Sequence, residues 1–239
     1  MKKIFIDSPL TDEIILDKEI THHLRVFRHD VHQPLTVTGS DNRSALYKIS
    51  GEEHGKARAS LIEFVEELTV THRTILVQSL LKGDKLEWVL QKATELNVDT
   101  IYLVTTANSI VKYDDKKLQA KLNRWDKITL EASQQCGRSQ LPSIVINETI
   151  SSIMELEKEA IKLVAYERED GYSIKQALQE EKDDRDILIC IGPEGGFQEK
   201  EINDIINSGG QSITLGPTIL RAETAAIAAL SMIQYEIEL

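Results

Sequence analysis

The pattern of apolar and polar positions changes partway along the 239-residue chain. In the first part, short apolar runs alternate with polar and glycine-containing turns, which predicts a small β-rich unit. From Thr74 onward, short apolar runs alternate with segments whose apolar residues recur every three or four positions. This rhythm predicts strands alternating with helices, which is typical of an α/β fold with a parallel sheet. We therefore expect two domains, residues 1–72 and 73–239.

The first domain is predicted to contain one helix and four strands. The helix covers Glu19–Phe27, and the strands cover Lys3–Ile6, Pro34–Thr38, Ala45–Ile49 and Arg58–Val65. Small barrels built from such strands are frequent nucleic-acid binders, although a fold does not by itself establish a function.

The second domain is predicted to contain strands and helices in alternation. The strands cover Ile75–Leu81, Ile101–Val104, Ile161–Ala165, Ile187–Ile191 and Ser212–Thr214. Helices are expected after Asp84, before Gly137, and over Ser173–Glu180, Phe197–Asn207 and Leu220–Ile237. Asp84 with Glu87 three positions on predicts a capping box, and Trp88 and Trp125 are expected in the core.

Composition narrows the class of protein. No apolar run approaches the ~18 residues of a membrane-spanning helix, and the N-terminus lacks the apolar region of a signal peptide. The two cysteines, Cys136 and Cys190, have no paired or metal-like spacing, so we expect a reducing cytoplasm. A net charge of −11 argues against a polyanionic partner, but residues 112–138 are locally basic. That stretch is either a footprint for phosphates or a solvated helix face, and charge alone favours the helix face.

Two loops rich in glycine and proline follow apolar strands near the C-terminus. Residues 191–197 read Ile-Gly-Pro-Glu-Gly-Gly-Phe, and residues 215–225 read Leu-Gly-Pro-Thr-Ile-Leu-Arg-Ala-Glu-Thr-Ala. In open α/β sheets, ligands bind at this end of the strands, and glycine lets the backbone approach them. The first loop has neither the Lys and Ser/Thr of a P-loop nor the spacing of a dinucleotide fingerprint. Glu194 would repel an anion, so a cationic or uncharged ligand fits better, such as an adenosine bearing a sulfonium.

The two loops together resemble the C-terminal signatures of RsmE, the bacterial 16S rRNA uridine-N3 methyltransferase family of the SPOUT class. Further matches at His22–Arg28, Gln91–Leu96 and Glu131–Arg138 extend the resemblance over nearly the whole chain. The resemblance implies a SPOUT-type parallel sheet with a trefoil knot, a PUA-like N-terminal β-barrel and a homodimer. It also implies S-adenosylmethionine (SAM) as cofactor and methylation of N3 of a specific uridine in 16S rRNA, within the assembled 30S subunit.

The resemblance also assigns site residues. It implies that the cofactor contacts Ala165, Tyr166, Glu167, Ile191, Gly192, Pro193, Gly195, Gly196, Leu215, Gly216, Ile219 and Leu220. RNA-facing residues are expected to be His22, His23, Arg25, Arg28 and Arg138. We expect no metal, because adjacent helical histidines point about 100° apart and do not easily chelate one ion.

The chemistry of uridine methylation suggests the catalytic residues. N3 becomes a nucleophile only when its proton leaves, and Arg221 is placed to stabilise negative charge on the uracil oxygens. Glu194 and Glu223 are candidate proton acceptors, although either could instead orient Arg221 or cap a helix. Two rival functions are 2′-O-methylation of RNA by another knotted enzyme and a non-catalytic RNA-binding assembly factor.

Overall fold

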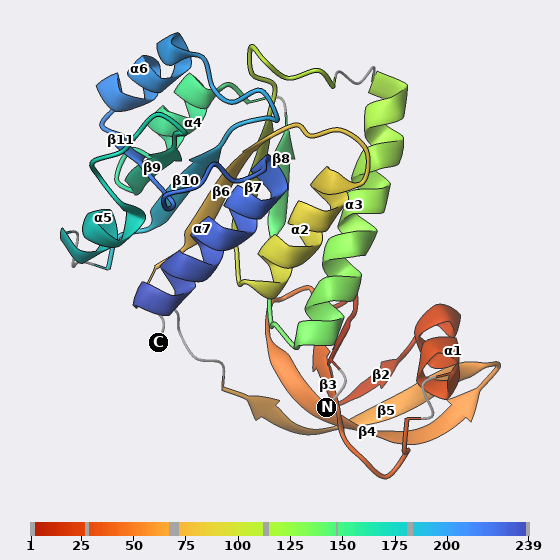
Figure 1. The fold of residues 1–239 in the computed structure, drawn as a ribbon. Helices are drawn as coiled ribbons and strands as arrows, with labels where there is room; N and C mark the ends of the chain where they lie inside the picture. The colour runs from red at the N-terminus through yellow and green to blue at the C-terminus, as the bar shows by residue number, and fades with distance from the viewer. Residues whose placement is uncertain are drawn as a thin grey trace. The chain divides into compact units, whose positions relative to one another are not determined.

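The computed structural model describes residues 3–26, 29–66, 72–111, 115–146, 148–180 and 184–237, and its fold is drawn in Figure 1. The chain folds as two compact units. The first comprises Met1–Thr69 together with Leu130–Leu141, and the second comprises Val70–Thr129 and Pro142–Leu239. Helical periodicity locates the helix before Gly137 but does not show that residues 130–141 pack with the first unit.

The first unit is built around a five-stranded sheet with the strand order β1-β3-β4-β5-β2. Its elements are β1 (Lys3–Phe5), β2 (Glu13–Ile15), α1 (Lys18–Val26), β3 (Leu35–Thr38), β4 (Ser44–Glu53) and β5 (Lys56–Val65). β1 and β3 are parallel, and the other neighbours are antiparallel. The four predicted strands and the helix are confirmed with shifted ends. The sequence analysis did not predict β2.

The second unit contains a six-stranded parallel sheet with the strand order β11-β9-β10-β6-β7-β8. The strands are β6 (Thr74–Ser79), β7 (Thr100–Val104), β8 (Ser143–Ile146), β9 (Ile161–Ala165), β10 (Ile187–Ile191) and β11 (Gln211–Ile213). The helices are α2 (Lys85–Glu95), α3 (Asp115–Cys136), α4 (Ile150–Leu156), α5 (Ile174–Glu180), α6 (Glu199–Asn207) and α7 (Ala222–Ile237). The part of α3 from Leu130 onward belongs to the first unit. The predicted α/β fold with a parallel sheet is confirmed. β8 and the short helix α4 were not predicted.

Helices cover both faces of this parallel sheet (Figure 1). Successive side chains of β6 point to opposite faces, so Leu76 joins the core under α2, α5 and α7, whereas Ile75 and Val77 join the core under α4 and α6. Burial on both faces explains why the strands read as continuous apolar runs. Within the described ranges, no helix has the length and apolar character needed to cross a membrane.

Two local predictions for α2 are wrong. Asp84 precedes the helix but makes no side-chain capping bond. Glu87 instead accepts hydrogen bonds across to α3, from Lys121 at 3.1 Å and from Arg124 at 2.5 Å. Trp88 is 51% exposed rather than in the core, and Trp125 is buried as expected. The contacts of Glu87 lie outside its own helix, so a local capping rule could not predict them.

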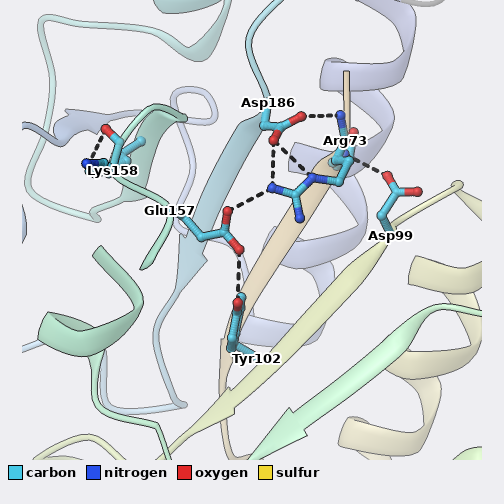
Figure 2. Close-up of polar contacts among 8 residues, drawn as sticks. Arg73, Asp99, Tyr102, Glu157, Lys158 and Asp186 are labelled. Atoms are coloured by element: carbon cyan, nitrogen blue, oxygen red, sulfur yellow. Dashed lines mark hydrogen bonds and ion pairs between the residues drawn. The ribbon is translucent and has the colours of Figure 1, made fainter. Parts of the chain in front are cut away.

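The amino-terminal ends of the central strands are joined by a network of charged residues (Figure 2). Arg73 directly precedes β6, and its guanidinium donates to Asp186 at 2.7 Å and to Glu157 at 2.9 Å. The Tyr102 hydroxyl donates to the other oxygen of Glu157 at 2.9 Å. Burial, reinforced by this bond, raises the pKa of Tyr102 to about 12. The network fastens β6 to β10 and α4 at the amino-terminal end of these strands, opposite the loop at residues 191–197 that follows β10.

Candidate functional site

A pocket of about 920 Å³ opens at the carboxyl ends of β9, β10 and β11. These strands are neighbours in the sheet, so the loops that follow them meet at one edge. Every residue predicted to contact the cofactor lines this pocket: Ala165, Tyr166, Glu167, Ile191, Gly192, Pro193, Gly195, Gly196, Leu215, Gly216, Ile219 and Leu220. The structure therefore gathers three segments, up to about 55 residues apart in sequence, into a single concave surface.

The loop after β10 depends on glycine for its shape. The amide of Gly196 donates to the carbonyl of Pro193 at 2.9 Å and closes a turn. Gly196 has φ +69°, and a Cβ there would lie 2.8 Å from a carboxylate oxygen of Glu167. Both the left-handed backbone and the close approach of Glu167 therefore require glycine at this position.

Asn108 holds the same loop from outside, and the sequence reasoning missed it. Its side-chain amide donates to the carbonyls of Gly195 and Gly196, each at 3.1 Å. The loop that carries Asn108 is itself attached to α6, because the amide of Ala107 donates to Glu201 at 2.9 Å. A lone asparagine after an apolar strand has no local signature, so only the folded arrangement identifies this contact.

The segment after β11 lies against the loop after β9. The amide of Thr214 donates to the carbonyl of Tyr172 at 2.8 Å, and the amide of Ile174 donates to the carbonyl of Thr214 at 3.1 Å. The chain then crosses the pocket through Leu215 and Ile219 before entering α7. Ile219 is 80% exposed although it is a large apolar residue, so this wall presents an uncovered apolar surface to a ligand.

The pocket wall after β9 is acidic. Glu169 accepts hydrogen bonds from the amides of Gly171 and Tyr172 and from the hydroxyl of Ser212. The bond from Ser212, together with the backbone bonds, lowers the pKa of Glu169. This carboxylate is therefore ionised at neutral pH, and like Glu167 it lines the pocket. An arrangement of this kind disfavours phosphate and favours a ligand with hydroxyl donors or positive charge.

The three predicted catalytic residues come from the P-E-G-G turn (residues 193–196) and from the start of α7. Arg221 and Glu194 line the pocket, and Glu223 is connected to it through Lys85. Glu194 accepts from the amide of Lys82 at 3.1 Å and from the ammonium of Lys85 at 3.4 Å. Burial acts to raise the pKa of Glu194, but its own backbone amide together with these two groups outweighs burial, and the pKa is lowered. Lys85 was not predicted from the sequence.

The predicted RNA-facing residues belong to the first unit. His22, His23 and Arg25 lie on α1 with exposed side chains, and Arg138 is half-buried just after α3. Arg25 forms an ion pair with Glu52 of β4, so part of its charge is already compensated. Arg28 lies outside the described residues.

The basic stretch 112–138 is partly neutralised in the folded protein. Lys121 and Arg124 both pair with Glu87. Burial acts to raise the pKa of Glu87, but the bonds from Arg124 and Lys121 outweigh it and the pKa is lowered. These two bases therefore serve the packing of α3 against α2, which neither the phosphate footprint nor the solvated helix face predicted.

The class of protein follows from the fold, the pocket and a family match. The model of the RNA methyltransferase domain family matches residues 68–234, which include the whole parallel sheet and all three pocket loops. The second unit is thus an RNA methyltransferase domain.

Individual relatives narrow the family. The chain is 32% identical to ribosomal RNA small subunit methyltransferase E of Bacillus subtilis, over 94% of this chain and 90% of the relative. A structure of ribosomal RNA small subunit methyltransferase E from Neisseria gonorrhoeae with SAM bound superposes with TM-score 0.82 at 26% identity, covering 98% of this chain and 97% of that one. A Legionella pneumophila protein solved with the cofactor SAM gives TM-score 0.84 at 29% identity, covering 98% and 96%. The chain belongs to the ribosomal RNA small subunit methyltransferase E family.

Proposed function

We propose that this protein transfers a methyl group from SAM to N3 of a specific uridine in the 16S rRNA of the small ribosomal subunit. The observation that carries the proposal is the pocket at the ends of β9, β10 and β11, with Arg221 on its rim. Relatives named for the RNA of the small subunit support the substrate. The resemblance of residues 191–197 and 215–225 to the uridine-N3 enzymes supports the choice of atom.

The residues of the pocket fit SAM. Its volume suits a ligand of nucleoside size, and its walls are mostly backbone and apolar side chains with several acidic residues among them. The carboxylates of Glu167 and Glu169 provide acceptors for hydroxyl or ammonium groups. Leu215, Ile219 and Leu220 offer apolar surface on which a purine ring can rest. When bound, SAM would supply a methyl group made electrophilic by its positively charged sulfonium.

The chain's own residues handle the charge that develops on the base. As N3 loses its proton, negative charge spreads to the neighbouring carbonyl oxygens of uracil. The guanidinium of Arg221 is exposed on the pocket rim and can donate two hydrogen bonds to one of those oxygens, which leaves N3 open to the methyl group. Glu194 and Glu223 both remain candidate proton acceptors, and the lowered pKa of Glu194 makes its carboxylate a weaker base than an ordinary glutamate.

We infer a trefoil knot in the second unit and a PUA-like barrel in the first. The pairing of Thr214 with the 172–174 segment supports the knot, because it places the chain beside the loop after β9 just before it enters α7. The curved five-stranded sheet with its helix α1 supports the barrel (Figure 1). The division into domains 1–72 and 73–239 stays a prediction, as does a cytoplasmic location.

A homodimer is part of the proposal. The apolar side chains of Ile219, Met232 and Tyr235 are exposed on α7 and the loop before it, and Trp88 is exposed on α2. α2 and α7 pack on each other, so these exposed residues belong to one helical layer. Analytical ultracentrifugation checks the dimer, with Met232→Asp as the variant expected to shift the protein toward monomer.

The test of function locates the methyl group. The protein is incubated with methyl-labelled SAM and either naked 16S rRNA or assembled 30S subunits, and digested RNA is analysed by mass spectrometry. We expect N3-methyluridine at one position, preferentially in 30S subunits. A 2′-O-methylated nucleoside would contradict N3 methylation and would indicate the 2′-O-methylation reaction of other knotted enzymes. Binding of SAM and RNA without any transfer would identify a non-catalytic assembly factor.

A further inference from the structure

Lys85, the first residue of α2, lies between two carboxylates from distant parts of the chain. Its ammonium nitrogen is 3.4 Å from Glu194 on the loop after β10 and 3.6 Å from Glu223 in the first turn of α7. Both carboxylates are largely buried, with 24% and 17% of their side-chain surfaces exposed. In the described residues, the Glu223 oxygen nearest Lys85 has no hydrogen-bond partner, so the ion pair with Lys85 is its polar contact.

Arg221 lines the same pocket as Glu194 and precedes Glu223 by two residues, but its side chain pairs with neither acid in the described part of the chain. In the described part of the chain, its guanidinium makes no hydrogen bond or ion pair, while its backbone carbonyl accepts from Ala225 at 2.7 Å. Lys85 and Arg221 are the basic residues among those that line the pocket. The carboxylates of Glu194 and Glu223 therefore pair with Lys85, and the side chain of Arg221 is exposed to solvent.

We propose that Lys85 is a positioning residue that occupies the carboxylates of Glu194 and Glu223 and so keeps the guanidinium of Arg221 free for the RNA substrate. The role of Arg221 toward RNA rests on the proposed function. The competition of Lys85 and Arg221 for the carboxylates of Glu194 and Glu223 does not depend on that function.

The energetics of charge pairing support this competition. Removing one partner from a largely buried ion pair leaves a charge that needs a new partner. A guanidinium binds carboxylates in a bidentate manner, and Arg221 is the remaining cation on the pocket wall once Lys85 is lost. Glu194 and Glu223 would then capture the group that the substrate needs. The lowered pKa of Glu194, to which Lys85 contributes, agrees with a carboxylate that stays ionised.

A chemical probe of Arg221 tests the inference without methyl transfer. Phenylglyoxal modifies free guanidinium groups, and peptide mass spectrometry follows the rate at each arginine. We expect Arg221 to react roughly threefold or more slowly in Lys85→Met than in wild type, because paired guanidinium groups are shielded. The double variant Lys85→Met/Glu223→Gln should regain much of the wild-type rate. Equal reactivity of Arg221 in wild type and Lys85→Met would overturn the proposal.

Turnover provides the second measurement. We expect Lys85→Met to lower the single-turnover rate about tenfold at saturating RNA and SAM, with little change in the Kd for SAM. Lys85→Arg should restore most of the rate, because it keeps a cation between the carboxylates. Lys175→Met is the matched control, because Lys175 lies in the first turn of α5, is exposed, and makes no hydrogen bond or ion pair within the described residues. A Kd effect as large as the rate effect would contradict positioning of Arg221.

The two tests separate this proposal from the proposed function. If wild type transfers no methyl group to RNA, the function fails, but the phenylglyoxal rates still decide whether Lys85 controls Arg221. If Lys85→Met does not fold, as judged by thermal unfolding, Lys85→Gln replaces it and keeps a polar side chain at the helix start. Faster modification of Arg221 in either variant would also reject the proposal.

Discussion

The side-chain amide of Asn108 lies 3.1 Å from the carbonyl of Gly195, 87 residues further along the chain. A second bond of equal length reaches Gly196, so one side chain fixes two consecutive peptide units of the pocket loop. A Cβ on Gly195 would approach Asn108 to 3.1 Å, which leaves no slack between them. The loop after β7 thus determines the shape of a loop that follows β10.

Asn108→Ala should loosen the P-E-G-G turn. Two hydrogen bonds are lost while the glycine carbonyls stay near solvent, so the Kd for SAM should rise about tenfold, with a small loss of stability. Isothermal titration calorimetry measures the Kd. Asn203→Ala, an exposed asparagine on α6, is the control and should leave it unchanged. An unaltered Kd for SAM in Asn108→Ala would mean that the turn keeps its shape without the hydrogen bonds from Asn108.

Gly196→Ala and Gly209→Ala separate backbone strain from pocket geometry. Both glycines have positive φ, +69° and +84°, so alanine at either should cost about 1 kcal/mol of folding free energy. A Cβ at Gly196 also displaces Glu167, whereas a Cβ at Gly209 meets nothing within 4 Å. We therefore expect similar losses in urea unfolding but weaker SAM binding in Gly196→Ala alone. Equal SAM affinity in both variants would show that the position of Glu167 does not contribute to SAM binding.

Arg221→Ala should damage the transition state more than either bound complex. We expect a fall of about 10²-fold in the single-turnover rate at saturating RNA and SAM, comparable to the loss of one oxyanion donor. Arg221→Lys should recover part of it, because a point charge lacks the planar fork. Arg168→Ala is the control, since Arg168 is exposed on the neighbouring loop and does not line the pocket. A rate within threefold of wild type would exclude Arg221 from the chemical step.

RNA binding should depend on salt through the first unit. Arg25→Glu with Arg138→Glu should weaken binding to the 30S subunit and reduce the slope of log affinity against log salt by about two, without changing SAM affinity. Arg58→Glu is the matched control, because Arg58 pairs with Glu53 much as Arg25 pairs with Glu52. Wild-type affinity in the double variant would place the RNA surface elsewhere.

Alkaline stability should report on the network around Glu157. Below about pH 10, Tyr102 is protonated in both the folded and the unfolded state, and its contribution to stability is complete. As the pH rises from about 10 to about 12, the unfolded chain releases this proton while the folded protein keeps it, so stability falls. Urea unfolding should show wild type losing stability relative to Tyr102→Phe over this range. Tyr235→Phe, at an exposed position, should show no such divergence from wild type.

The sequence predicted what depends on local pattern. Glycine, proline and apolar runs located the loops at residues 191–197 and 215–225, and parallel strand order brings their backbones together without further information. Side chains that reach across the fold were missed. Lys85 contacts Glu194 over a separation of 109 residues, and neither residue carries a local sign of the other. Trp88 was misplaced because helical periodicity does not distinguish a core position from an exposed one at the edge of the apolar stripe.

The order of strands also has a consequence for how the protein is made. β6 pairs with β10. Leu76 therefore has no strand partner at Ile189 until more than a hundred intervening residues have been synthesised. β6 and β7 can associate early, because they are close in sequence, but the other edge of β6 stays open until β10 emerges. The pocket is completed later still, when residues 215–221 have left the ribosome. Each new molecule therefore gains its binding pocket only near the end of translation. Until β10 emerges, the open apolar edge of β6 is a potential site of aggregation.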